Sequence, residues 1–283
     1  MPELPEVQTT VTSLTPLIGQ KITNICIFQP KLRWQMPDDL SDLLNFELKC
    51  VERRAKYLIL TFTDQVIEKK LIIHLGMSGS LQQHSHGFQV RKHDHLLLEF
   101  SDNKATTQLH YHDPRRFGAV LWHDEFADKL LNHLGVEPLS HDFTAVYLYK
   151  TIHERKQAMK RPIKAVIMEQ AIVVGVGNIY ATESLFLCKI HPLTPANLLS
   201  YQQLSDLVRQ IRKILQTAIE KGGSTLKDFS VGAEKAGYFQ QTLNVYSHKD
   251  KPCPICQTPI ESVKIAQRAS NFCPNCQPLP NIV

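Results

Sequence analysis

Short apolar runs recur between residues 21 and 122 and are separated by turn residues. Runs of this length and spacing are typical of an all-β sandwich or barrel. Residues 1–17 precede them and are predicted to form an extended PELPE segment, followed by an amphipathic helix. The polar stretch 82–91 is predicted to be a loop. The runs expected to form strands are 22–28, 46–51, 57–62, 70–74, 95–100 and 119–122.

The second half of the chain has helical periodicity at 143–150, 163–170, 179–189 and 201–220. Residues from about Asp124 to Gly135 are interpreted as a connection, and Gly222 with Gly223 is predicted to end the last helix. An irregular stretch at 224–242 leads into a small cysteine-bearing unit. The pattern predicts an α+β multidomain protein: a β-sandwich with an N-terminal helix at 1–125, a helical domain at 126–240 and the cysteine unit at 243–277.

Composition narrows the class of protein. Hydrophobic residues make up 43% of the 283 residues, which is enough for packed cores. No stretch reaches the roughly 18 unbroken apolar residues of a membrane-spanning helix. The acidic N-terminus lacks the apolar segment of a signal peptide, so a soluble cytoplasmic protein is expected. The chain shows no heptad pattern, which makes a monomer the default expectation.

The charge pattern points weakly toward a polyanionic partner. The net charge is +5, a mild excess that many enzymes share. Basic residues cluster at 53–56 and 156–164, and phosphate binding needs several cations along one track. Each cluster taken alone also fits a solvated face.

The strongest local motif consists of two CxxC pairs, Cys253 with Cys256 and Cys273 with Cys276. Four thiolates in this spacing match one structural Zn²⁺ ion in a tetrahedral site. The residues between the pairs are predicted to form a β-hairpin, too small to fold without the metal. Disulfides are disfavoured because the total of seven cysteines is odd and no signal peptide is present. The other cysteines, Cys26, Cys50 and Cys188, are interpreted as small buried hydrophobes.

The glycine run at 173–178 (VVGVGN) does not fit a dinucleotide loop, because it lacks the third glycine and the acidic residue that such a loop requires. No nucleotide cofactor is therefore expected. A tight turn between two helices fits better, with Asn178 placed to cap the second helix and to reach a phosphate. A purely structural turn is an equal alternative.

Taken together, these motifs resemble the bacterial formamidopyrimidine-DNA glycosylase family. The N-terminal PELPEV at 2–7 matches the hallmark of that family, and the matches run in order from residue 2 to residue 277. The other matching motifs are 53–57 (RRAKY), 74–79 (HLGMSG), 92–95 (KHDH), 113–118 (DPRRFG), 163–164 (IK), 175–180 (GVGNIY), 191–192 (HP), 222–229 (GGSTLKDF), 237–239 (GYF) and 267–268 (QR). The resemblance implies an N-terminal β-sandwich, a helix–two-turns–helix DNA-binding domain and a zinc finger.

The resemblance also implies excision of oxidised purines, 8-oxoguanine and formamidopyrimidines, from double-stranded DNA, with AP lyase activity by β,δ-elimination. Removal of Met1 would make Pro2 an N-terminal secondary amine, able to attack the sugar and form a Schiff base. Glu3 is the expected general acid, with a pKa raised by burial. Lys56 and Arg268 resemble the family residues that contact the phosphates and assist elimination. For Arg53 and Arg54, ordinary surface charge is the preferred interpretation.

An enzyme of this kind must flip the base out of the duplex and fill the space it leaves. Met77, Arg115 and Phe117 match the wedge residues of the family, although core packing is the ordinary expectation for Met77 and Phe117. The resemblance further implies DNA contacts for His93, Lys160, Lys164 and Asn178.

Three departures limit the resemblance. Gln8 stands where the family commonly has glutamate, the loop 231–236 has no fixed motif, and the tail after Cys276 is expected to be disordered. Two alternatives stay open: an oxidised-pyrimidine glycosylase of the endonuclease VIII type, and a non-catalytic zinc-ribbon DNA-binding protein. Leu4 and the complete wedge set favour the purine branch.

Overall fold

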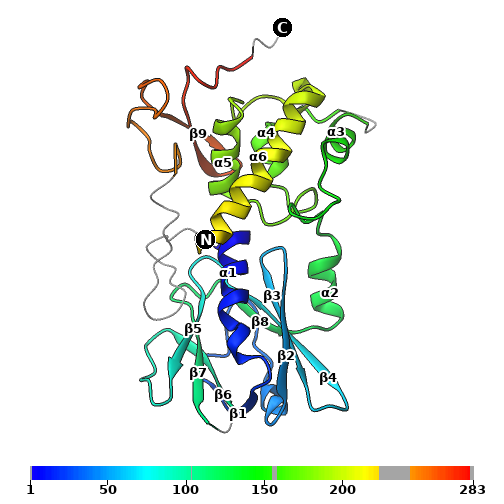
Figure 1. Ribbon diagram of the computed structural model, residues 1–283, viewed down its shortest axis with the longest axis vertical. Helices are drawn as coiled ribbons and strands as arrows, with labels where there is room; N and C mark the ends of the chain where they lie inside the picture. Colours follow the sequence, from blue (N-terminus) through cyan, green and yellow to red (C-terminus); the bar gives the residue numbers. More distant parts are fainter. Residues whose placement is uncertain (1, 103, 155–157, 223–242, 281–283) are drawn as a thin grey trace. The chain divides into compact units, whose positions relative to one another are not determined.

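The computed structural model describes residues 2–102, 104–154, 158–222 and 243–280. The described residues up to His133 form one compact unit, and Leu134–Glu220 with the residues from 243 onward form a second (Figure 1). The boundary between the two units therefore falls between residues 133 and 134, whereas the sequence pattern placed the end of the first domain at residue 125. The motifs predicted at 223–229 and 237–239, and the loop 231–236, lie outside the described residues. No helix in the described ranges combines the length and apolarity needed to cross a membrane.

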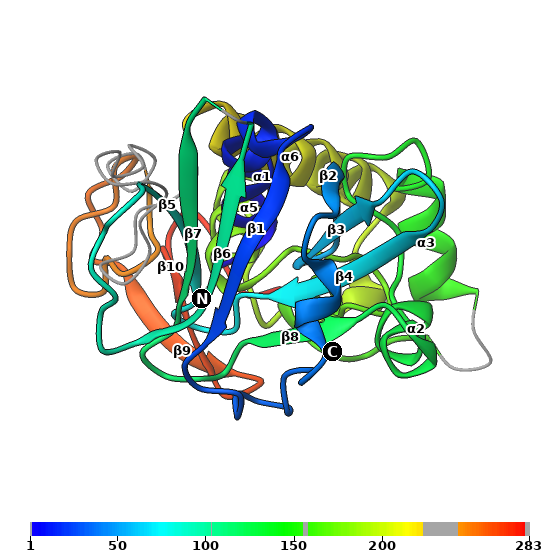
Figure 2. The ribbon, with the colours of Figure 1, turned by 90° about the horizontal axis from the view of Figure 1, so that it is seen from below.

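The first unit is built on one hydrogen-bonded sheet with strand order β5-β7-β6-β1-β2-β3-β4-β8. A single registered pair, Lys21 with Glu47, joins β1 to β2, so the sheet folds there into two halves (Figure 2). This is the predicted sandwich. The strands are β1 (Lys21–Ile27), β2 (Glu47–Arg54), β3 (Tyr57–Thr63), β4 (Glu68–His74), β5 (Ser80–Ser85), β6 (Asp94–Ser101), β7 (Thr106–His112) and β8 (Ala119–Trp122).

Both halves of the sheet and α1 (Leu4–Leu14) contribute to one buried core. Alternate residues of β3, Leu58, Leu60 and Phe62, are fully buried, as a strand with one face on the core requires. Short 3-10 helices, η1 (Thr15–Leu17) and η2 (Leu40–Leu43), cover the edge of this core.

Helix α1 begins at Leu4, earlier than predicted, so the extended segment ends at Glu3. Proline is compatible with the first turn of a helix, because the amide it lacks has no helical partner there. The Glu6 carboxylate accepts a hydrogen bond from the Glu3 backbone N–H at 2.8 Å and closes a capping box. The PELPE segment is therefore a helix start.

Strands β5 and β7 were not predicted, and the prediction of a loop at 82–91 is wrong for residues 82–85. Their buried side chains are partly polar. Gln108 donates to Glu99 at 2.7 Å, and Gln82 donates to Ser80 at 2.8 Å. Polar groups can be buried when they are hydrogen-bonded, and the few apolar residues of β5 and β7 are too sparse to reveal a strand.

Helix α2 (Glu125–Asn132) occupies the stretch that was interpreted as a connection. Its N-cap is Asp124, whose carboxylate accepts from the N–H groups of Phe126 and Ala127. The second unit contains α3 (Ala145–His153), α4 (Ile163–Ile167), α5 (Asn178–Leu187), η3 (Ala196–Leu198), α6 (Tyr201–Glu220) and the hairpin β9 (Glu261–Ile265) with β10 (Arg268–Phe272). Helix α6 packs against α3 and α5, and α5 also contacts β10.

Candidate functional site

The start of α1 carries the proposed nucleophile and acid. Pro2 is buried, and Glu3 is only 2% exposed. Helix α1 packs against β2 and β3, the two strands that flank Lys56. The chain thus brings the elements that carry Glu3 and Lys56 into contact within the first unit.

Arg53 links the turn that carries Lys56 to helix α1. The Arg53 guanidinium donates to the Gln8 side chain of α1 at 3.0 Å and to the Ala55 carbonyl at 2.9 Å. Ala55 has a positive φ of 54°, and Lys56 is 9% exposed. Interpreting Arg53 as surface charge was therefore wrong, because it ties α1 to this turn. Gln8 supplies the acceptor through its amide oxygen, a position that a carboxylate could also fill.

His74, at the end of β4, is a residue whose role sequence reasoning missed. Burial, together with the nearby charges of Lys56 and Arg33, lowers its pKa from the ordinary 6.5 to about 4, against an opposing effect of Asp113. Its Nδ1 accepts a hydrogen bond from the Gly76 N–H at 3.1 Å. A neutral histidine therefore anchors the loop that contains Met77.

The proposed wedge residues lie on two loops of the first unit, outside its core. Phe117 is 47% exposed, which excludes the core packing that would ordinarily be expected of it. The Arg115 guanidinium lies 5.1 Å from the centre of the Phe117 ring, a cation–π arrangement. Met77 is half-buried. An exposed aromatic ring under a cation suits insertion into stacked bases.

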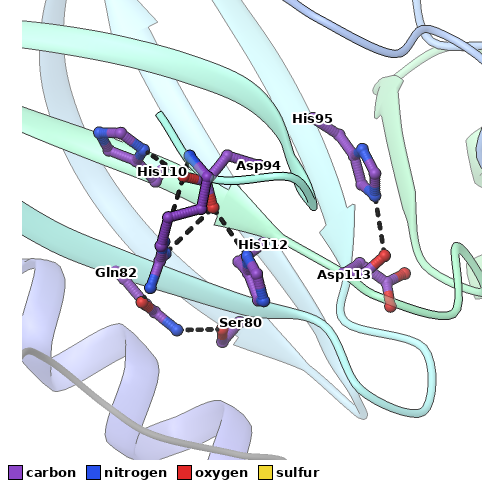
Figure 3. Close-up of polar contacts among 8 residues, drawn as sticks. Ser80, Gln82, Asp94, His95, His110, His112 and Asp113 are labelled. Carbon is purple, nitrogen blue, oxygen red and sulfur yellow. Dashed lines mark hydrogen bonds and ion pairs between the residues drawn. The ribbon is translucent and has the colours of Figure 1, made fainter. Parts of the chain in front are cut away.

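His93 lies in the turn before β6, beside a buried carboxylate. Desolvation and the charge of Lys92 lower the pKa of His93. Figure 3 shows the Asp94 carboxylate between His110 and His112, whose Nδ1 atoms lie 2.9 and 2.7 Å from it. Arg91 also donates to this carboxylate at 3.0 Å. Burial opposes ionisation of Asp94, but these hydrogen bonds outweigh it and hold its pKa well below the usual range.

The basic residues of the second unit differ in their exposure. Lys160 is exposed, as a phosphate contact requires. Lys164 is fully buried, and its ammonium donates to Asn178 and Thr182 at 2.8 Å and to Ser270 at 2.7 Å. It has no exposed surface for a DNA phosphate, so the prediction of direct contact through Lys164 is corrected to an internal role.

Asn178 takes part in the same internal network. The N-cap of α5 is Gly177, so the predicted capping role of Asn178 is wrong. Its amide accepts from Lys164 and donates to the Ala269 carbonyl of β10 at 3.1 Å. The predicted tight turn between helices is present, and Gly175 has a positive φ of 76° there. Lys164 and Asn178 together fasten β10 to α4 and α5.

Arg268 is exposed at the first position of β10. The turn before it places Ala266 and Gln267 at positive φ values of 45° and 63°. Two consecutive positive φ values define the tight hairpin turn, which usually selects asparagine or glycine. Neither is present here, so the turn is held in place by the pairing of β9 with β10.

The four cysteines of the two CxxC pairs lie together, with all sulfur atoms within 4.8 Å of one another. The distances from Cys253 to Cys276 and from Cys256 to Cys273 are 3.9 and 3.4 Å. Sulfurs that bind one Zn²⁺ at about 2.3 Å stand about 3.8 Å apart, whereas a disulfide requires about 2.0 Å. The residues fit one structural zinc ion. Cys26, Cys50 and Cys188 are partly exposed instead of buried.

Two buried polar residues attach the cysteine unit to α5 and to the segment that follows it, and both were missed from sequence. Glu183 is fully buried and accepts from the backbone N–H groups of Asn244, Val245 and Tyr246 at 2.8–2.9 Å. Gln277, in the tail expected to be disordered, is also buried and donates to the Ile190 carbonyl at 2.7 Å. A glutamate on the apolar α5 was the available signal for the first of these.

Family profiles match almost the whole chain. Residues 1–120 match the formamidopyrimidine-DNA glycosylase N-terminal domain, and residues 134–230 match the H2TH domain of the same family. Residues 250–279 match a zinc finger found in FPG and IleRS.

Curated relatives and solved structures agree with these profiles. The chain is 56% identical to a formamidopyrimidine-DNA glycosylase of Psychrobacter arcticus and 50% identical to that of Acinetobacter baylyi, in each case over 99% of both chains. A Lactococcus lactis FPG mutant in complex with Fapy-dG containing DNA superimposes with a TM-score of 0.86 at 34% identity, covering 98% of this chain and 100% of that one.

A second solved structure, MutM in complex with carbocyclic 8-oxo-G containing DNA, gives a TM-score of 0.85 at 35% identity, again over 98% of this chain and 100% of the other. The agreement covers the sandwich, the helical domain and the cysteine unit alike. The chain therefore belongs to the formamidopyrimidine-DNA glycosylase family.

Proposed function

We propose that this chain is a bifunctional DNA-repair enzyme that excises oxidised purines from duplex DNA and then cleaves the strand by β,δ-elimination. The observation that carries the proposal is the buried Glu3 beside Pro2, on a helix packed against the strands that flank Lys56. Family membership over the full chain supports it. The related structures are complexes with DNA that contains Fapy-dG or carbocyclic 8-oxo-G, which favours purine lesions for this chain too.

Pro2 supplies the covalent step once Met1 has been removed. An α-amino group has a pKa of about 7.7–8.0, so a useful fraction is unprotonated near neutral pH. The nitrogen attacks the sugar C1′ while the bond from C1′ to the base breaks and the base takes up a proton. The nitrogen then gives up its own proton, and the bond from C1′ to the ring oxygen breaks with protonation of that oxygen, which leaves an iminium. This cation makes the C2′ proton acidic, so loss of that proton expels the 3′-phosphate. A second elimination expels the 5′-phosphate.

Glu3 is proposed as the general acid, donating a proton to the sugar ring oxygen or to the departing base. Its burial keeps water away from the reacting atoms. The neighbouring Glu6 has a structural task, because it caps the helix start. Lys56 and the exposed Arg268 are proposed to bind the phosphates that flank the lesion.

DNA binding is assigned to exposed and partly exposed groups of both units. Arg115 and Phe117 with Met77 are proposed to fill the space left by the flipped base, and His93 and Lys160 to contact phosphates. Lys164 and Asn178 act indirectly, by fixing the hairpin that presents Arg268. The zinc ion supplies structure to that hairpin and no chemistry, because all its ligands are cysteines of the protein.

Borohydride trapping tests the proposal. Reduction during turnover on a duplex with 8-oxoguanine opposite cytosine should link the enzyme covalently to DNA through Pro2. A peptide extension ahead of Pro2 should abolish the adduct, and the same extension at the C-terminus should leave it. The variant Glu3→Gln should form little adduct on this duplex but should still be trapped on DNA with an existing abasic site, where no base has to leave.

The trapping result also separates the rival functions. Tight DNA binding without an adduct from the native N-terminus would favour a non-catalytic zinc-ribbon protein. Faster cutting of thymine glycol than of 8-oxoguanine would favour an enzyme of the endonuclease VIII type. The expectations of a monomer, of no nucleotide cofactor and of a cytoplasmic location stay predictions.

A further inference from the structure

The two wedge loops cross between the halves of the sheet side by side. Residues 75–79 lead from β4 to β5, and residues 113–118 lead from β7 to β8. At one end His74 pairs with Ala119, and at the other end Ser80 pairs with His112. The first loop therefore begins where the second ends and ends where the second begins, and strand pairing fixes both places.

A single buried carboxylate bonds to both loops. Asp113 has no exposed surface, and its Oδ1 accepts from the Ser78 hydroxyl at 2.7 Å. The same oxygen accepts from the Arg115 N–H at 3.3 Å, and Oδ2 accepts from the Gly118 N–H at 2.9 Å. The Ser78 hydroxyl also accepts from the Arg115 N–H at 3.3 Å. Ser78 directly follows Met77, and Asp113 begins the loop of Arg115 and Phe117. The Ser78–Asp113 pair therefore joins the two loops that carry the wedge residues.

Three further contacts fix the same arrangement. A Cβ atom on Gly76, which has a φ of +63°, would lie 2.4 Å from the Phe117 carbonyl carbon, so the loop backbones touch there. In Figure 3 His95 points toward Asp113, and its Nε2 lies 2.8 Å from the Asp113 carbonyl oxygen. The Asp113 N–H donates to the His93 carbonyl at 3.0 Å. Asp113 thus joins the two wedge loops through its carboxylate and contacts the start of β6 and the residue before it through its backbone.

We propose that the Ser78–Asp113 pair is a positioning device that sets the spacing between Met77 and the Arg115–Phe117 pair, so that the three side chains enter the duplex as one rigid unit. The inference rests on the proposed function, because it explains the spacing of side chains that are proposed to insert into the duplex. Side chains on loops need such support, because their own contacts do not hold them at a fixed distance. Asp113 and Ser78 touch neither the lesion nor the nucleophile in this assignment.

The variant Ser78→Ala tests the pair, because it removes the link between the loops and keeps the backbone. Single-turnover excision of 8-oxoguanine would be measured on two substrates, a full duplex and the same strand with a one-nucleotide gap opposite the lesion. The gapped substrate has no partner base to contact and less stacking to replace. We expect about a tenfold slower reaction on the duplex, in line with loss of a hydrogen bond to a charged group, and less than about a twofold change on the gap.

Ser80→Ala is the matched control, since it removes another buried hydroxyl nearby without touching Asp113. It should leave the ratio of the two rates unchanged. Ser78→Cys keeps the size and a weak donor, so it should give an intermediate ratio and serves if the alanine variant does not fold. An equal slowing on both substrates, or no change on either, would overturn the inference. A wild-type protein that cuts neither substrate would overturn the proposed function as well.

Discussion

A neutral His74 makes the wedge loop sensitive to acid. Its folded pKa of about 4 lies below the ordinary 6.5, so the unfolded chain binds this proton more readily. Stability from this residue is complete above pH 6.5 and is lost as the pH falls toward 4, by up to about 3 kcal/mol. Protonation at Nδ1 would also break the hydrogen bond from Gly76.

The variant His74→Asn should flatten this pH dependence, because an asparagine oxygen can replace Nδ1 as acceptor without titrating. Chemical denaturation between pH 4 and 7 would measure it: the wild type should lose more stability over this window than the variant does. The control is His123→Asn, which removes a histidine of the same unit that lies outside both wedge loops and bonds to Asp128 of α2 instead. Parallel stability curves for wild type and His74→Asn would show that His74 does not carry this dependence.

The wedge loops also show which residues a sequence can reveal. The apolar members of the core follow the hydrophobic pattern, and the buried Leu58, Leu60 and Phe62 lie in a run, 57–62, that was predicted to form a strand. Asp113 and Ser78 show no hydrophobic pattern that would predict their burial. Each can be buried because it bonds to the other, and the two lie 35 positions apart in the sequence. The motifs identified which loops matter, whereas their mutual bonding required the fold.

Among the elements, those with a one-sided apolar pattern were predicted best. Helix α6 has the predicted bounds, because its buried residues recur at helical spacing over twenty residues. Strands β5 and β7 were missed because Gln82, Gln108 and His110 are buried as hydrogen-bonded polar groups. Helix α2 was missed because it is short, although Asp124 is the type of residue that caps a helix.

The attachment of β10 to α4 and α5 depends on Lys164, so replacement of this lysine should weaken that attachment. Lys164→Met keeps the length of the side chain but leaves Asn178, Thr182 and Ser270 without their shared donor. Buried polar groups that lose a partner cost about 1–3 kcal/mol each, so we expect the second unit to lose about 3 kcal/mol or more. Amide hydrogen exchange in β10 should accelerate in parallel.

Lys160→Met is the matched control, since it removes an exposed lysine of the same unit and should leave both readouts unchanged. The two variants should differ in DNA binding as well. Loss of the exposed cation should weaken the salt dependence of binding, which reports the number of phosphate contacts. A Lys164→Met protein as stable as the wild type would contradict the internal role.

At the scale of the molecule, the sandwich and the cysteine unit each have a hydrophobic cluster. The core of the first contains residues of the sandwich and α1. The cysteine unit has a small cluster of its own, in which Cys253, Cys273, Val245 and Ile260 pack with Phe186 of α5. A cluster of this size provides too little burial to fold a domain, so the metal must supply the rest.

Removal of zinc should therefore unfold one part of the protein and spare the other. A strong chelator should abolish the exchange protection of β9 and β10, while the sandwich keeps its own unfolding transition. DNA affinity should fall, because Arg268 depends on a hairpin that no longer forms. Zinc returned in stoichiometric amount should restore both, and Cys26→Ser should behave as the wild type because Cys26 is outside the cluster. Full protection of β10 in metal-free protein would mean that the contacts of Lys164, Asn178 and Glu183 suffice to hold the hairpin, and that the zinc is dispensable for its fold.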